Sequence, residues 1–220
     1  MKSENTIENK KTYEDLTTLV STNFCITHFI IDGDDLWFTS GSFNYLFRMS
    51  TSDWVVKDAI RIPLDKAYVK NNCIKYIFEN DEYIYMIPFR VKDILIRYNL
   101  RDGIMEKLDI NLPQGMWGDC TDEDNQFVYM TKKDEPKLIR INKTTLEVDE
   151  KIIETGKGYT FVKKMDMNYV LIRADNGTIV VWNETDGVKQ VITNNVEGLG
   201  MKYGHYYSDI GEVLPSGTII

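Results

Sequence analysis

The chain has few residues whose type and spacing could do chemistry. It contains only two histidines, His28 and His205, and neither has a histidine, cysteine or glutamate at the spacing of a metal site. No nucleophile motif of the Gly-x-Ser-x-Gly type, phosphate-binding loop or dinucleotide-binding glycine motif is present. The sequence therefore predicts no metal ion, no cofactor and no catalytic residue.

Four residues have the types that bind a small ligand: Trp117, Asp119, Tyr159 and His205. Each is expected near the start of an innermost strand in its own sequence repeat, so in a closed ring of repeats they would converge on one mouth of a central channel. An aromatic ring beside a carboxylate is a usual arrangement for binding a sugar or a peptide. The alternative is that these large side chains pack between neighbouring sheets.

The acidic residues leave a second function open. With 34 aspartates and glutamates, the chain could be a carbohydrate-active enzyme, a lyase or hydrolase with acidic residues at the channel mouth. Glycoside hydrolysis needs two carboxyl groups about 5–10 Å apart, and the sequence does not select such a pair. Asp122-x-Asp124-x-Gln126 resembles half of a calcium loop but lacks the glycine and the final glutamate of an EF-hand. Acidic turns occupy the same place in other repeats, so a turn is the expected role.

Three arginines occupy one equivalent position. Arg48, Arg97 and Arg140 fill it in three repeats, and Val181 fills it in the fourth. A ring of arginines could bind an anion. The interpretation that we prefer is structural, with each arginine lying along the surface of its sheet and pairing with an acidic residue of the outermost strand.

These residues belong to a segment that recurs four times along the chain. Its equivalent turn residues are 41 to 49 positions apart: Ser50, Asn99, Asn142 and Asn183. A run of aromatic or β-branched residues precedes each copy of this segment and recurs at a similar spacing: Asp35–Thr39, Glu82–Met86, Gln126–Met130 and Asn168–Ile172. A period of this length, built from short strands, is the mark of a β-propeller blade.

Each repeat is expected to hold four strands, of which the run and the recurring segment are the second and third. The first strands are expected at Phe24–Ile30, Cys73–Phe78, Trp117–Thr121 and Tyr159–Lys163. The fourth strand has the highest charge, as an exposed sheet edge should.

One repeat resembles known propeller repeats. Asp32-Gly33-Asp34-Asp35-Leu36-Trp37-Phe38-Thr39-Ser40 resembles the D-x-x-G-x-L-W-F-G-T consensus of two-component-regulator propeller repeats, and Tyr45-Leu46-Phe47-Arg48-Met49 is similar to repeats of bacterial extracytoplasmic propellers. Ser40-Gly41 departs from the expected Gly-Thr, and later repeats lose the tryptophan, so the resemblance covers one blade well and three loosely. It implies a propeller with a sensing or binding role and no catalytic residue.

The expected fold is therefore all-β, a single β-propeller domain over residues 12–220 after a disordered tail at residues 1–11. Four full four-stranded blades at about 24–65, 66–112, 113–154 and 155–196 precede a partial fifth blade at 197–220, which the N-terminal segment 13–20 would close. A four-bladed propeller and a fragment of a larger propeller are the alternatives.

The net charge and the composition limit the classes of molecule that the chain is expected to bind. The formal net charge of −8 makes nucleic acid and anionic membranes poor partners. A protein, a peptide or a neutral carbohydrate is expected instead, and the expected function is a non-catalytic ligand-binding or protein-interaction module. The sequence shows no secretory signal and no membrane-spanning stretch, which favours the cytoplasm. Cys25, Cys73 and Cys120 are an odd set without metal spacing and are expected to be free thiols.

Overall fold

The computed structural model describes residues 26–40, 43–64, 74–89, 94–113, 115, 117–119, 121–154 and 156–193. Regular structure in these residues is entirely β-strand. Within them, no helix has the length and apolar character needed to cross a membrane. The all-β class expected from the sequence is confirmed.

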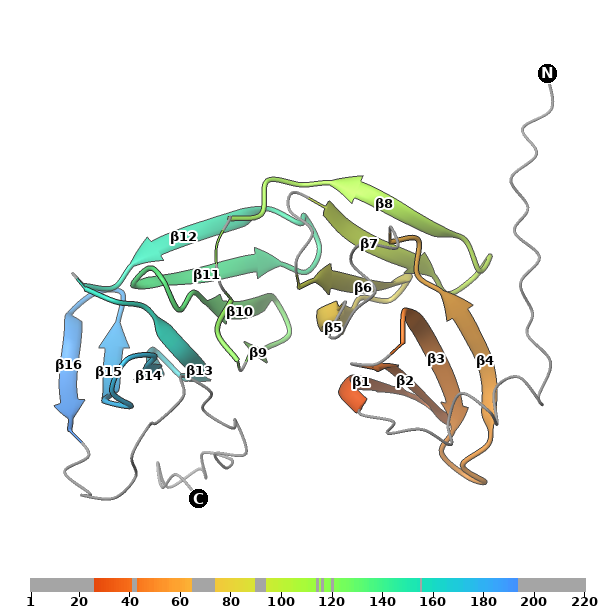
Figure 1. The fold of residues 1–220 in the computed structure, drawn as a ribbon, viewed down its shortest axis with the longest axis horizontal. Coiled ribbons are helices and arrows are strands. Elements are labelled where there is room, and N and C mark those ends of the chain that lie inside the picture. The colour runs from red at the N-terminus through yellow and green to blue at the C-terminus, as the bar shows by residue number, and fades with distance from the viewer. Residues whose placement is uncertain are drawn as a thin grey trace. The chain divides into compact units, whose positions relative to one another are not determined.

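The strands form four antiparallel sheets of four strands, and in each sheet the strands follow one another in chain order (Figure 1). We call these sheets blades 1 to 4. Blade 1 consists of β1 (Ile26–Asp32), β2 (Asp35–Ser40), β3 (Tyr45–Ser50) and β4 (Val56–Arg61). Blade 2 consists of β5 (Ile74–Glu79), β6 (Tyr83–Pro88), β7 (Ile94–Asn99) and β8 (Met105–Asp109). Blade 3 consists of β9 (Asp122–Glu123), β10 (Phe127–Thr131), β11 (Lys137–Asn142) and β12 (Val148–Ile152). Blade 4 consists of β13 (Tyr159–Met165), β14 (Asn168–Arg173), β15 (Ile179–Asn183) and β16 (Gly187–Ile192).

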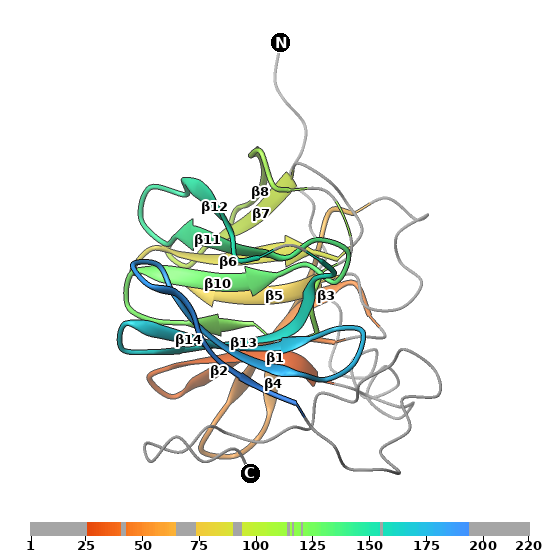
Figure 2. The ribbon, with the colours of Figure 1, turned by 90° about the vertical axis from the view of Figure 1, so that its left-hand side faces the viewer.

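The four blades are distributed over two compact units. Unit 1, Met1–Leu112, contains blades 1 and 2, and unit 2, Pro113–Ile220, contains blades 3 and 4. The two blades of unit 1 meet through β1 and β5, and those of unit 2 meet through β10 and β13. Figure 2 shows β10 and β13 in adjacent layers.

The expected strand order is confirmed in all four blades, with one local difference. In blade 3 the expected first strand at Trp117–Thr121 is reduced to an isolated bridge between Trp117 and Lys132, followed by the two-residue β9. The partial fifth blade at 197–220, the N-terminal segment 13–20 and all three cysteines lie outside the described residues.

Each unit has a core in which two blades share their apolar faces. In unit 1, Trp37 and Leu46 of blade 1 cluster with Ile84 and Met86 of blade 2. Successive side chains of a strand point to opposite faces, so the neighbouring Phe38 falls on the other face of blade 1. In unit 2, blades 3 and 4 share a cluster that includes Tyr129, Leu138, Tyr159, Leu171 and Trp182.

The turn between the third and fourth strands is set by one side chain. Asn142 Oδ1 accepts hydrogen bonds from the backbone N–H groups of Thr144 and Thr145, both at 2.9 Å. Asn99 and Asn183 make the same pair of bonds two and three residues ahead. Asparagine favours such turns because its side chain mimics a backbone carbonyl. The recurring asparagine found in the sequence is thus a turn-forming residue.

The fifth residue of this turn adopts a left-handed backbone in every blade. Its φ is +73° at Gly103 and +74° at Gly187, but also +59° at Trp54 and +60° at Leu146. Glycine adopts this region without steric cost, whereas other residues are strained there by about 1–2 kcal/mol. Two of the four turns therefore hold a side chain where glycine fits better.

Substitutions at this turn position are expected to change stability in opposite directions. A Cβ at Gly187 would meet no atom within 4 Å, so Gly187→Ala adds backbone strain alone and should lower the free energy of unfolding by about 1 kcal/mol. Trp54 is 68% exposed, so Trp54→Gly removes strain with little loss of packing and should raise it by about 0.5 kcal/mol. Urea unfolding of both variants measures this. Stabilisation by Gly187→Ala would contradict it.

His28 lies at the contact between blades 1 and 2. It is on β1, and its ring meets Tyr76 of β5 edge-on, with ring centroids 4.6 Å apart. Burial, aided by the charge of Lys75, lowers the pKa of His28 to about 4 from its ordinary 6.5, although a backbone hydrogen bond at Lys75 opposes the shift. The folded protein therefore favours the neutral imidazole.

The pKa of His28 predicts acid sensitivity in unit 1. As the pH falls below about 6.5, His28 becomes protonated in the unfolded chain, but in the folded chain it stays neutral until about pH 4. The free energy of unfolding therefore falls between these two pH values. At about pH 4.5 the loss attributable to His28 should be about 2–3 kcal/mol. His28→Gln should remove this part of the decline between about pH 7 and pH 4.5 in urea unfolding. An equal decline in wild type and variant would show that other groups cause it.

Candidate functional site

The structure places three of the four predicted ligand-binding residues in unit 2, where blades 3 and 4 meet. Trp117 is 6% exposed and Tyr159 is fully buried. Asp119 keeps 29% of its side-chain surface exposed. His205 lies outside the described residues. The aromatic rings thus sit in the packed interior, as the packing alternative requires, and the accessible member of the set is the carboxylate.

Gly118 allows the segment before β9 to run between β10 and β13. A Cβ on Gly118 would lie 2.2 Å from Thr131 Oγ1 and 3.0 Å from the carbonyl oxygens of Tyr159 and Thr160. Real Cβ contacts are longer than this, so glycine is required for the close approach. Gly118 N–H donates to the Thr131 carbonyl at 2.7 Å, and Asp119 N–H donates to the Thr160 carbonyl at 2.6 Å. The segment bonds to each blade in turn, which explains why it leaves the expected ladder.

Asp119 is the centre of a polar cluster. Its Oδ1 lies 2.6 Å from Lys133 Nζ, and its Oδ2 accepts a hydrogen bond from Thr160 Oγ1 at 2.6 Å. We call Asp119, Lys133 and Thr160 the Asp119 cluster. Lys133 lies two residues after the end of β10, and Thr160 lies on β13. The cluster therefore joins the two blades of unit 2 with a carboxylate, an ammonium and a hydroxyl in fixed positions.

A buried polar layer supports the cluster from the β10 end. Lys132 is almost fully buried and pairs with Glu135. The carbonyl of Lys132 accepts from Tyr159 N–H at 2.7 Å. Tyr159 Oη donates to Glu154, which also accepts from Arg173 at 2.7 Å. Burial and the Glu154 carboxylate both raise the pKa of Tyr159, so Tyr159 is a neutral donor that orients β13.

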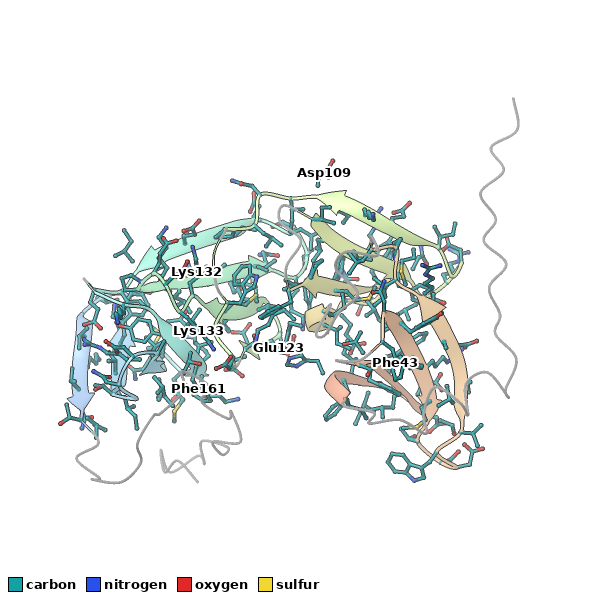
Figure 3. All side chains as sticks on the ribbon, in the orientation of Figure 1. Phe43, Asp109, Glu123, Lys132, Lys133 and Phe161 are labelled. Carbon is teal, nitrogen blue, oxygen red and sulfur yellow. The ribbon has the colours of Figure 1, made fainter. Side chains whose placement is uncertain are left out.

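Two further carboxylates, those of Asp122 and Glu123, lie on β9. Asp122 accepts from Lys163 Nζ at 2.8 Å and from the Lys164 backbone N–H at 2.7 Å, which is a second link from blade 3 to blade 4. Glu123 lies 3.4 Å from Lys143 Nζ. Figure 3 shows Glu123 and Lys133 with Phe161 near the inner strands β9 and β13.

Two adjacent acids have pKa values shifted in opposite directions. Burial raises the pKa of Glu123, and the attraction of Lys143 offsets only part of that shift. At Asp124 burial acts in the same sense, but hydrogen bonds from Tyr129 and from the backbone of Phe127 and Gln126 outweigh it and lower the pKa. One carboxyl that retains its proton more readily beside one that is ionised is a pattern found in acid–base sites.

The arginine series is structural, as the sequence analysis preferred. Each arginine pairs across strands with an acid of the outermost strand: Arg48 with Asp58, Arg97 with Glu106 and Arg140 with Asp149. Each guanidinium also lies 4.6–5.5 Å from the centre of an aromatic ring of the second strand: Trp37, Tyr83 and Phe127. Arg48 and Arg97 find these partners within their own blades, whereas Arg140 also pairs with Glu184 of blade 4 at 2.5 Å.

Asp124 has the expected turn role. Its Oδ1 accepts from the backbone N–H groups of Gln126 and Phe127, both at 2.8 Å, and its Oδ2 accepts from Tyr129 Oη at 2.5 Å. Among the residues that the structure describes, no three histidine, cysteine or acidic side chains are grouped to hold a metal ion.

Sequence reasoning missed Lys133, Thr160 and Glu123. A lysine just after a strand and a threonine within one carry no motif, and only the closure of blade 3 against blade 4 brings them to Asp119. The glycine pair around Trp117, at Gly115 and Gly118, is the one sequence signal of a close backbone approach there.

Comparisons with known proteins support the fold. No protein-family model matches the chain, and no curated protein matches its sequence. Among solved structures, virginiamycin B lyase from Staphylococcus aureus is similar with a TM-score of 0.57 and 13% identity, over 80% of this chain and 58% of the lyase. The Pan2 WD40 domain of Neurospora crassa is similar with a TM-score of 0.51 and 14% identity, over 77% of this chain and 50% of that one. The computationally designed Ika4 protein has a TM-score of 0.51 at 10% identity, over 73% of this chain and 92% of Ika4.

These likenesses and the four repeated sheets define the fold as a β-propeller with four described blades. The chain spans just over half the length of the lyase. At such low identity the likeness shows the fold alone. The neighbours include a lyase and a WD40 domain, so the fold does not select between catalysis and binding.

The Asp119–Lys133 pair is expected to contribute to the stability of unit 2. Both side chains are less than one-third exposed, so their coupling should be about 1 kcal/mol, at the upper end for partly exposed pairs. A double-mutant cycle of Asp119→Asn and Lys133→Met, read by urea unfolding, measures this coupling. Strictly additive effects would mean that the pair adds nothing.

Proposed function

We propose that this chain is a ligand-binding module built on a β-propeller, and that the Asp119 cluster is part of its binding surface. Its ligand is a peptide segment of a protein partner or a neutral carbohydrate. The observation that supports this most is the cluster itself: a partly exposed carboxylate held in place by an ammonium and a hydroxyl, each 2.6 Å away.

The chemistry of the cluster suits a neutral polar ligand. A fixed carboxylate accepts hydrogen bonds, while the lysine and threonine donate them, so the site can bind groups that both donate and accept, such as sugar hydroxyls and peptide amides. Because the opposite charges of Asp119 and Lys133 largely cancel, a charged ligand gains little there. The net charge of −8 acts against nucleic acid.

The internal pairing of the cluster also favours binding over catalysis. A nucleophile or general base needs an adjacent group that activates it. Asp119 is instead ion-paired with Lys133 and hydrogen-bonded to Thr160. Rigid side chains that are oriented before binding lower the entropic cost of binding a ligand.

A second function is favoured by one observation, the raised pKa of Glu123 beside the lowered pKa of Asp124. In a carbohydrate-active enzyme, a hydrolase or lyase, Glu123 would be the general acid on the innermost strand of blade 3. Asp124 is engaged by its turn and by Tyr129, so the second carboxylate would have to come from another residue. We place this function second for that reason.

Binding is tested with two probes, an array of neutral oligosaccharides and a phage library of displayed random peptides. Asp119→Asn and Thr160→Val should each weaken the selected interaction about tenfold, which corresponds to about 1.4 kcal/mol. The matched control is Asp149→Asn, which breaks the ion pair with Arg140 on blade 3 and should leave binding unchanged.

The same oligosaccharides decide between the two functions. Cleavage products that disappear in Glu123→Gln, with binding retained, would establish the enzyme and reject the non-catalytic module. Equal loss of binding in Asp119→Asn and in Asp149→Asn would reject the Asp119 cluster as the binding surface.

A further inference from the structure

The outermost strand of blade 4 differs from the other three outermost strands. β4, β8 and β12 each have three charged residues: Lys57, Asp58 and Arg61; Glu106, Lys107 and Asp109; Asp149, Glu150 and Lys151. β16 has one, Lys189, whose Nζ lies 3.0 Å from Asp186. Its Val188, Val191 and Ile192 are 38%, 50% and 43% exposed.

Blade 4 has also lost the pair that charges this edge in the other blades. Where an arginine faces an outer-strand acid in blades 1 to 3, Val181 of β15 faces Gln190 of β16. Both members of the pair are therefore uncharged. The change affects the third and fourth strands together, so Lys189 is the one charged residue of β16, and it is paired with Asp186.

An outermost strand presents unpaired backbone N–H and C=O groups to its surroundings. Charged side chains protect such an edge from pairing with another strand. In the described part of the chain, β16 is the last strand of its sheet. It is six residues long and lacks the protection that β4, β8 and β12 have, so it can accept a further strand.

The sequence of β16 is complementary to itself. In an antiparallel alignment about the centre of the strand, Val188 of one copy faces Val191 of the other, and Lys189 faces Gln190. Val188 pairs with Trp182 and Val191 with Val180 of β15, and Lys189 is the extra residue of a bulge between them. Trp182 and Val180 belong to one apolar cluster, so both valines lie on the same face and can meet their counterparts.

We propose that β16 pairs antiparallel with β16 of a second copy of this chain. The alignment sets valine against valine twice and places no lysine opposite a lysine. A neutral edge is also where two copies of a chain with net charge −8 approach with least repulsion. Pairing six residues buries less than the roughly 1,200 Å² of a standard interface, so the dimer is weak, with a dissociation constant of the order of 100 µM.

Sedimentation velocity of the full chain from about 10 to 500 µM tests the proposal. The weight-average mass should rise toward that of a dimer, and added salt should strengthen association because it screens the repulsion between copies. Val191→Lys, which sets a charge opposite Val188, should weaken association at least tenfold. Ile152→Lys is the matched control: Ile152 is 72% exposed on the charged strand β12, and this variant should associate like the wild type.

Hydrogen exchange of the wild-type chain gives a second measurement that does not depend on a variant folding. Backbone amides of β16 should exchange more slowly at the high concentration than at the low one, while those of β12 should not change. A monomer at every concentration, equal association of Val191→Lys and Ile152→Lys, or concentration-dependent protection confined to strands other than β16 would each overturn the proposal.

Discussion

The structure depends on one constraint: each four-stranded sheet is apolar on both faces. In blade 1, Trp37 and Leu46 occupy one face, and the stacked rings of Phe38 and Phe47 occupy the other. A sheet of this kind cannot be stable alone in water, because at least one face would remain exposed. Blades must therefore pack face to face, and every other feature of each unit is arranged around that packing.

The candidate site follows from how blades 3 and 4 meet. Large apolar side chains fill the centre of the contact between these two blades. The polar groups lie beside the segment at Gly118 and Asp119, whose backbone N–H groups donate hydrogen bonds to both sheets. Desolvated polar groups need partners. Lys133 and Thr160 supply them for Asp119, and Lys163 does so for Asp122. Packing thus produces a rigid polar surface in which most charges are already balanced.

Much of the fold could be predicted from the sequence because strands and turns leave local signals. Asn99, Asn142 and Asn183 recur for a local reason, the turn that each one orders. The structural role of the three arginines was also predictable, because the register between third and fourth strands follows from the short turn between them. The hydrogen bonding of residues 117–119 to both blade 3 and blade 4 could not be predicted. It depends on a contact with blade 4 that no local sequence pattern encodes.

The candidate site was predictable only in part. Asp119 was named as a candidate by its type and position, and its role in binding stays a prediction. The burial of Trp117 and Tyr159 was not predictable, because an aromatic residue at a strand end does not reveal it. Lys133 and Thr160 are 14 and 41 positions from Asp119 and share no motif with it. A cluster assembled from three separate segments becomes visible only when the chain is folded.

The turns between third and fourth strands have a consequence for how such a protein changes over evolutionary time. The side chain at the first position, asparagine in three blades and Ser50 in blade 1, accepts a backbone hydrogen bond within the turn. The backbone at the fifth position is left-handed whether the residue is glycine, tryptophan or leucine. A mutation there alters stability by about 1 kcal/mol but not the path of the chain. Each blade therefore offers one position on its surface where new side chains can be sampled without redesigning the scaffold. Trp54 shows that this position can hold a large aromatic side chain exposed to solvent, and exposed side chains on a fixed backbone are positions from which a repeat protein can acquire new contacts.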